Sequence, residues 1–135
     1  MNDIIMLKPP VEIIVMKRTF VQTRSFSKNW DRLGFTDEDL RSLEQQIMEN
    51  PKRWPVVQGT GKLRKMRFAF HNRGKRDSVR VCYIDFDVYC TTYLFTVYPK
   101  NDKDDLSSQE CNEVRKYVAI LEAELESIGG KNECI

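Results

Sequence analysis

The chain has 135 residues, of which 22 are Lys or Arg and 20 are Asp or Glu. A hydrophobic content of 41% beside 31% charged residues is typical of a soluble globular protein and excludes a disordered one. This length is enough for one hydrophobic core but not for two, so we expect a single domain. Pro9-Pro10, Asp3 and Glu12 interrupt the apolar N-terminal stretch and argue against a signal peptide or a membrane span.

The cysteines and the single histidine have no spacing that suits a metal ion. Cys82, Cys90, Cys111 and Cys134 include no CxxC pair, and His71 is the only histidine. Because zinc sites need clustered Cys and His ligands, we expect no metal and no cofactor. Thiols in a chain without a secretory signal are expected to stay reduced, which predicts a cytoplasmic protein.

The positive charges are clustered. Eight of the 22 basic residues fall between Lys62 and Arg80, a 19-residue window with one acid, Asp77, so the window carries +7. The other 116 residues carry 14 basic and 19 acidic side chains, or −5. Clustered Lys and Arg attract polyanions because neutralised phosphates release their counterions. Since the charges alternate with strand-forming residues, a positive sheet surface that binds nucleic acid is favoured over a solvated basic hairpin.

The N-terminal half predicts one strand and two helices. A stretch rich in β-branched and aromatic residues indicates the strand. The longer helix can be capped by Thr36, has three acids in its first turn, and ends before Pro51. The expected elements are a strand at 16–23 and helices at 25–33 and 36–50.

The C-terminal half predicts three strands, at about 63–70, 79–86 and 91–98, and then a long helix. The first of these strands alternates, with Lys65 and Arg67 opposite its apolar residues. Antiparallel pairing with the next strand puts Lys65, Arg67 and Arg80 on one outward face. The helix starts with a capping box at Ser107 and Glu110, ends at Gly129-Gly130, and carries an apolar stripe.

The order and spacing of three short sequences resemble RelE/HigB-type toxins of bacterial type II toxin–antitoxin systems, within the RelE/ParE superfamily. The resemblance runs from about Met16 to Leu125. Residues 1–15 have no counterpart and form an N-terminal extension, either an extra strand or a stretch before a natural start at Met16; residues 16–135 form the single toxin domain. The sequences are Gln58-Gly59-Thr60-Gly61-x-Leu63-Arg64-Lys65-Met66-Arg67, Gly74-Lys75-Arg76-x-x-x-Arg80-Val81-x-Tyr83 and Tyr98-Pro99-Lys100-Asn101-Asp102.

This resemblance implies an α+β fold, a small twisted antiparallel sheet with helices packed on one face. It implies a cytoplasmic, ribosome-dependent endoribonuclease that cuts mRNA in the decoding site and is silenced by an antitoxin, typically one with a helix-turn-helix domain. RNA carries its own nucleophile, the 2′-OH, so that this cleavage needs positioning, charge stabilisation and proton transfer but no metal. The implied partners are the antitoxin, the ribosome and mRNA, with no membrane and no metal.

The resemblance assigns catalytic roles to Lys65, Arg67, Arg80 and Lys100. A lysine among other cations gives up its proton more easily, so Lys65 is the candidate general base. The general acid is left open among Tyr98, Lys100 and Lys103. The further RNA-binding candidates are Lys62, Arg64, Arg73, Lys75, Arg76 and Lys103.

Plainer interpretations exist for the same residues. Lys65 and Arg67 could be the solvated face of an amphipathic strand, and Arg80 could pair with Asp85 or Asp87. Trp30 and Trp54 could stack on bases, but packing in the core or a loop is favoured. Two other functions are also compatible with the pattern. They are a ParE-like toxin that poisons DNA gyrase and a non-catalytic module that binds RNA or the ribosome. For the antitoxin, we expect a mostly apolar contact on the helices, because the stripe over residues 111–128 could exceed what the core needs.

Overall fold

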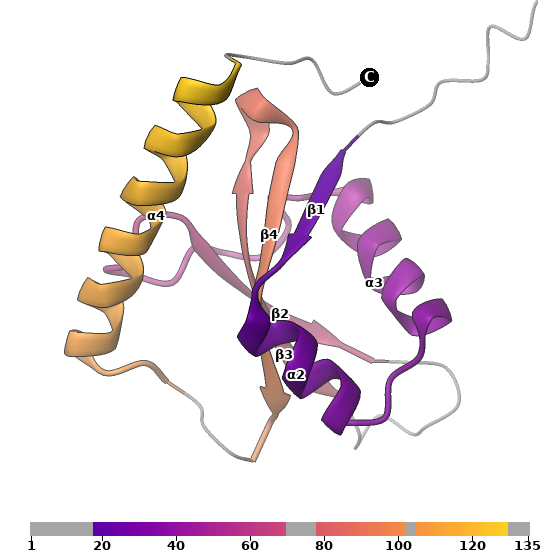
Figure 1. Cartoon of the computed structure of the whole chain (residues 1–135). Helices are drawn as coiled ribbons and strands as arrows, with labels where there is room; N and C mark the ends of the chain where they lie inside the picture. Colours follow the sequence, from indigo (N-terminus) through magenta and orange to yellow (C-terminus); the bar gives the residue numbers. More distant parts are fainter. Residues whose placement is uncertain (1–17, 70–77, 102–104, 130–135) are drawn as a thin grey trace, which may run out of the picture.

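A computed structural model describes residues 18–69, 78–101 and 105–129 (Figure 1). The predicted N-terminal extension, residues 1–15, lies outside these ranges. Four strands form one sheet in the order β1-β4-β3-β2. The elements are β1 (Thr19–Gln22), α2 (Arg24–Arg32), α3 (Asp37–Glu49), β2 (Leu63–Phe68), β3 (Val79–Phe86), the 3-10 turn η2 (Asp87–Tyr89), β4 (Thr91–Pro99) and α4 (Ser108–Ile128).

The predicted class, α+β with a small twisted sheet, is confirmed, but the sheet is not antiparallel throughout. β2, β3 and β4 pair antiparallel as expected. β1 pairs parallel to β4, with Thr19 opposite Thr91 and Gln22 opposite Leu94, so the sheet is mixed. Parallel neighbours need a long crossover connection, and here the two helices α2 and α3 and the strands β2 and β3 supply it.

The three helices begin at the residues that the sequence indicates. Thr23 caps α2, its hydroxyl accepting a hydrogen bond from the Phe26 amide at 3.0 Å. A capping box of Thr36 and Asp39 opens α3, and one of Ser107 and Glu110 opens α4. Each box satisfies two backbone donors that the first turn would otherwise leave unpaired. The predicted helix boundaries agree with the structure to within two residues.

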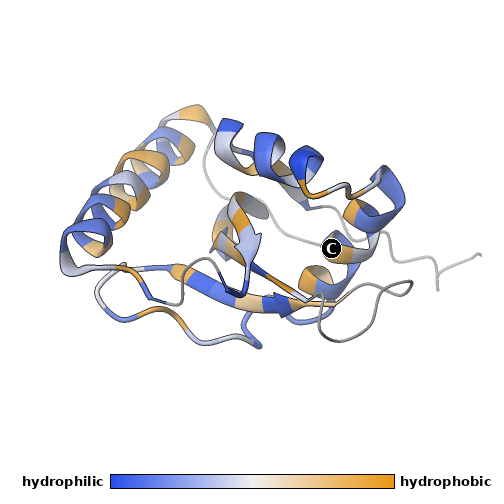
Figure 2. Ribbon diagram, turned by 90° about the horizontal axis from the view of Figure 1, so that it is seen from below, coloured by the Kyte–Doolittle hydropathy of each residue, from blue (hydrophilic) through white to orange (hydrophobic). Residues whose placement is uncertain are grey.

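Strand alternation divides the core between the two faces of the sheet. Val81 and Tyr83 on β3 belong to the cluster that packs with α2 and α3. Cys82 and Ile84, which point the opposite way, belong to the cluster that packs with α4. α2 and α3 therefore share one face, as expected, while α4 flanks the sheet on the other side (Figure 1). Figure 2 shows α4 as alternating apolar and polar bands, as expected of a helix with one buried side.

The apolar stripe of α4 is used mainly inside this chain. Val114, Val118 and Leu121 are buried against the sheet, whereas Ile128 is 73% exposed. The expected apolar antitoxin contact therefore cannot use the middle of this stripe without opening the core. Among the described residues, the large apolar side chain that α4 exposes besides Ile128 is that of Ile120.

A turn before β2 fixes where that strand starts. The Thr60 side chain is fully buried; its hydroxyl donates to the Val57 carbonyl at 2.7 Å and accepts from the Leu63 amide at 3.2 Å. Gly59 and Gly61 both have φ of +88°, a left-handed conformation that favours glycine. The Gly-Thr-Gly sequence thus forms a turn, and it sets the side-chain alternation of β2.

The expectation that all four thiols stay reduced is wrong. Cys90 is disulfide-bonded, whereas Cys82 and Cys111 are free thiols. Disulfide formation depends on distance in the folded chain, which local Cys spacing does not reveal. None of the helices in the described ranges is long and apolar enough to span a membrane.

Candidate nucleic-acid interface on the sheet

Two cross-strand rows place the predicted basic residues on one face of the sheet. In the first row Arg67 lies opposite Arg80, and Arg80 lies opposite Tyr98. In the second, Lys65 lies opposite Cys82. Residues directly opposite each other in a sheet project to the same side, and residues two apart in a strand share a face. The structure thus brings together the side chains of Lys65, Arg67, Arg80 and Tyr98, and we call these four residues the basic face.

The basic face continues the side of the sheet that α4 partly covers. The cluster packed against α4 contains Leu63, Cys82 and Ile84, which lie toward one end of β2 and β3. Arg67 lies further toward the other end and is exposed. α4 thus covers one part of this face, and the adjoining part carries the cations.

One nitrogen of the Arg80 guanidinium, Nη1, is buried without a hydrogen-bond partner among the described residues. The proposed ion pairs of Arg80 with Asp85 or Asp87 are not formed. Both carboxylates bond to Arg18, and Asp85, five residues further along β3, lies on the opposite face of the sheet. Leaving a buried charged donor unpaired costs free energy, of the order of 1–3 kcal/mol or more. An anion bound at the basic face would remove this cost.

Lys65 has a weak and replaceable partner. Its Nζ lies 3.8 Å from Oδ1 of Asp105, just before α4. The Lys65 side chain is 27% exposed and the Asp105 carboxylate 92% exposed. Exposed pairs of this kind contribute little to stability because water and salt screen them. A phosphate can therefore displace Asp105 at low cost.

Tyr98 is held over a buried thiol. Burial raises the pKa of Cys82 to about 11, while the side-chain hydrogen bond with Tyr98 and the positive charge of Lys65 act in the opposite direction. The thiol is therefore protonated at neutral pH and is not a nucleophile. Its hydrogen bond with Tyr98 links the row of Arg67, Arg80 and Tyr98 to the row of Lys65 and Cys82. No sequence pattern indicated this role for Cys82.

Two predicted RNA-binding residues do not join the basic face. Arg64 lies on the opposite face, where its Nη1 donates to the Trp54 carbonyl at 2.5 Å and anchors the loop before β2. The Nζ of Lys62 lies 5.7 Å from the Phe86 ring centroid, a cation–π contact. Both residues stabilise the fold at these positions.

Lys100, the other candidate acid, follows β4 directly and is exposed at the strand end that carries Tyr98. Trp30 is buried and Trp54 packs against the same cluster, in agreement with the favoured core interpretation. The candidates Arg73, Lys75, Arg76 and Lys103 lie outside the described residues.

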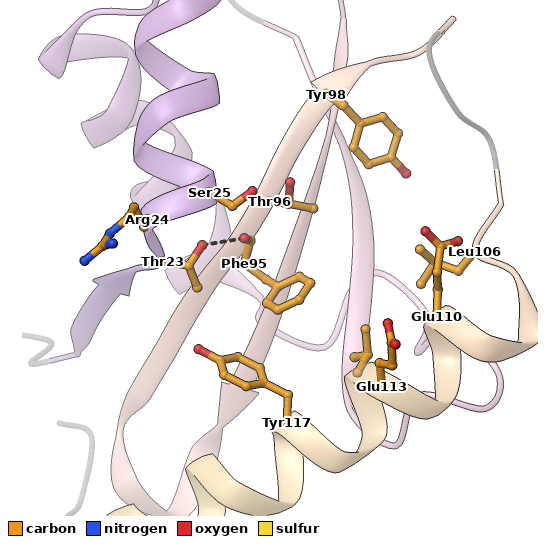
Figure 3. A pocket seen from close by; sticks show the side chains of 11 residues that line it. Thr23, Arg24, Ser25, Phe95, Thr96, Tyr98, Leu106, Glu110, Glu113 and Tyr117 are labelled. Atoms are coloured by element: carbon orange, nitrogen blue, oxygen red, sulfur yellow. Dashed lines mark hydrogen bonds between the residues drawn. The ribbon is translucent and has the colours of Figure 1, made fainter.

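A cleft of about 820 Å³ has Tyr98 in its wall (Figure 3). Its walls come from three segments that are distant in sequence, so local patterns could not reveal it. The rings of Phe95 and Tyr117 lie with their centroids 5.5 Å apart. The lining residues are Thr23, Arg24, Ser25, Phe95, Thr96, Tyr98, Leu106, Glu110, Glu113, Val114 and Tyr117.

The basic face can bind and polarise a phosphate. Two guanidinium groups and an ammonium group can neutralise its oxygens, and a phenol lies beside them. Within residues 18–69, 78–101 and 105–129, no group of three or more His, Cys, Asp or Glu side chains could hold a metal ion. No protein-family model matches the chain.

Proposed function

We propose that this protein is the toxin of a type II toxin–antitoxin module, a metal-independent endoribonuclease that cuts mRNA on the ribosome. The resemblance to RelE/HigB-type toxins suggests the activity. The observation that supports it is the buried, unpartnered Nη1 of Arg80, which lies in one cross-strand row with Arg67 beside Lys65. A cation kept without a partner at a cost in free energy is expected where an anionic substrate binds.

The proposed reaction uses the RNA's own 2′-OH. Lys65 accepts the 2′-OH proton as the oxygen attacks phosphorus, and the bond from phosphorus to the 5′-oxygen breaks. The products are a 2′,3′-cyclic phosphate and a 5′-hydroxyl, which takes its proton from Tyr98, Lys100 or Lys103. Arg67 and Arg80 stabilise the charge on the pentavalent phosphate. Asp105, whose Oδ1 lies 3.8 Å from the Lys65 Nζ, must move away to let the 2′-OH reach this nitrogen.

The partners and the compartment follow from this proposal. A nuclease that acts on cellular mRNA works in the cytoplasm, on ribosomes that carry mRNA. It also needs a cognate antitoxin, which typically has a helix-turn-helix domain. The basic face offers an acidic antitoxin segment the same charge complementarity as RNA. The gyrase-poisoning and non-catalytic alternatives predict no cut mRNA, so an assay for mRNA cleavage separates them from this proposal.

Primer extension on cellular mRNA after induction of the protein tests the proposal. We expect cuts in phase with codons, and the same cuts when purified protein acts on programmed ribosomes. Arg80→Ala should abolish them, while Arg41→Ala, which removes an exposed arginine on α3, should not. Altered DNA supercoiling without cuts would indicate the gyrase alternative. Stalled translation with neither effect would indicate a non-catalytic binder.

A further inference from the structure

The cleft beside Tyr98 differs in chemistry from the basic face. Its floor is made of half-buried rings, those of Phe95, Tyr98 and Tyr117. Glu110 and Glu113 rise from α4 toward Tyr98, as Figure 3 shows. Arg24 lies at one end, and its guanidinium points away from these two carboxylates. The cleft therefore combines aromatic faces with negative charge, directly next to a positive surface.

The two carboxylates are not equivalent. Oε1 of Glu110 accepts the Ser107 amide at 2.9 Å and so caps α4. Glu113 is exposed and forms no hydrogen bond or ion pair within the described part of the chain. Glu113 is therefore the carboxylate that can bind a ligand without loss of a helix cap.

We propose that this cleft binds an arginine side chain, flanked by apolar residues, from a partner protein. A guanidinium is planar, stacks on aromatic rings and pairs with a carboxylate through two parallel hydrogen bonds. Apolar neighbours of that arginine would cover the half-buried side chains of Phe95 and Leu106. A cleft of about 820 Å³ has room for such a segment of a few residues.

Charge argues against RNA as the occupant. A nucleobase could stack on Phe95 or Tyr117, but its phosphates would then lie near Glu110 and Glu113, which repel them. The basic face, which shares Tyr98 with the cleft, attracts the same phosphates. Because Tyr98 lines the cleft and also belongs to the basic face, a bound partner would lie against a residue of the basic face. The inference does not depend on nuclease activity.

The test is a ¹H–¹⁵N NMR titration of the full chain with the acetylated, amidated tripeptide Leu-Arg-Leu. Saturable shifts are expected at the amides of Phe95, Glu113 and Tyr117. The matched probe is Leu-citrulline-Leu, which has the same shape but no charge. It should bind at least about tenfold more weakly, because a charge-assisted pair is lost.

The variant Glu113→Gln should lose most of the arginine preference. Glu126→Gln, which removes an exposed carboxylate further along α4, should keep it. Equal binding of the two peptides, or no saturable shift at these amides, would overturn the proposal. Shifts of the same amides by guanosine monophosphate but not by Leu-Arg-Leu would assign the cleft to RNA instead.

Discussion

Arg67 and Arg80 lie directly opposite each other on the antiparallel strands β2 and β3. Like charges at opposite positions destabilise a sheet, typically by some tenths of a kcal/mol up to about 1 kcal/mol. An acidic residue at either position would turn this repulsion into attraction, yet both positions hold arginine. A local cost of this kind is typical of a binding site, where the ligand supplies the missing opposite charge.

Replacing Arg67 by glutamate should therefore raise stability and abolish function. Arg67→Glu converts a repulsive cross-strand pair into an attractive one, and we expect the free energy of unfolding to rise by about 1 kcal/mol. Toxicity on induction should disappear, because a carboxylate repels phosphate. Urea unfolding and a growth assay measure the two effects. The control is Lys28→Glu, the same charge change at an exposed site on α2. An Arg67→Glu protein no more stable than this control would contradict the repulsion argument.

Arg80→Ala should reduce cleavage on programmed ribosomes by about 30- to 1,000-fold, which corresponds to a loss of roughly 2–4 kcal/mol of transition-state stabilisation. The fold should persist, because the side chain leaves no described hydrogen-bond partner unpaired. Single-turnover cleavage and circular dichroism are the measurements. A folded variant that cuts mRNA at the parent's rate would remove Arg80 from the catalytic group.

Local sequence patterns predicted most of the elements for identifiable reasons. Capping boxes at Thr36 and Ser107 act within one helical turn, so helix starts can be read from neighbouring residues. Alternation along β2 likewise put Lys65 and Arg67 on one face. The same alternation places Arg64 with Met66 on the other face, whereas the count of charges in one window does not distinguish the two faces.

Long-range relationships could not be predicted in the same way. The parallel pairing of β1 with β4 joins residues about seventy positions apart, and no local signal specifies it. Arg18 bonds to Asp85 and Asp87 across a similar separation, which no local pattern indicates. The cleft beside Tyr98 depends on three segments that meet only in the folded chain.

Stability should fall in mild alkali because of Cys82. Its thiol titrates near a pKa of 9.0 when unperturbed, and burial raises this pKa to about 11 in the folded protein. Above pH 9 the unfolded chain releases the proton first, so the free energy of unfolding decreases as pH rises from about 9 to about 11. This pKa difference between the unfolded and the folded chain corresponds to a total decrease of about 3 kcal/mol in the free energy of unfolding.

Cys82→Ala should remove this dependence up to about pH 10, where Tyr83, whose pKa burial raises from 10.0 to about 12, begins to act in the same direction. The variant is expected to be less stable overall because it loses a buried side chain, so that the readout is the slope of stability against pH and not its absolute value. Urea unfolding at intervals from pH 7 to pH 10 measures that slope. Identical slopes for the parent and Cys82→Ala would show that the thiol does not cause the alkaline loss.

Lys65→Arg separates charge from proton transfer. Arginine keeps the positive charge opposite Cys82 and beside Asp105, but it does not release a proton near neutral pH. Ribosome binding should therefore stay within about twofold of the parent, whereas cleavage should fall by about 10²- to 10⁴-fold, the usual contribution of a general base. Lys116→Arg, the same change at an exposed position of α4, is the control and should cut normally. Full cleavage by Lys65→Arg would mean that a cation at this position is sufficient, and the general base would then have to be sought elsewhere on the basic face.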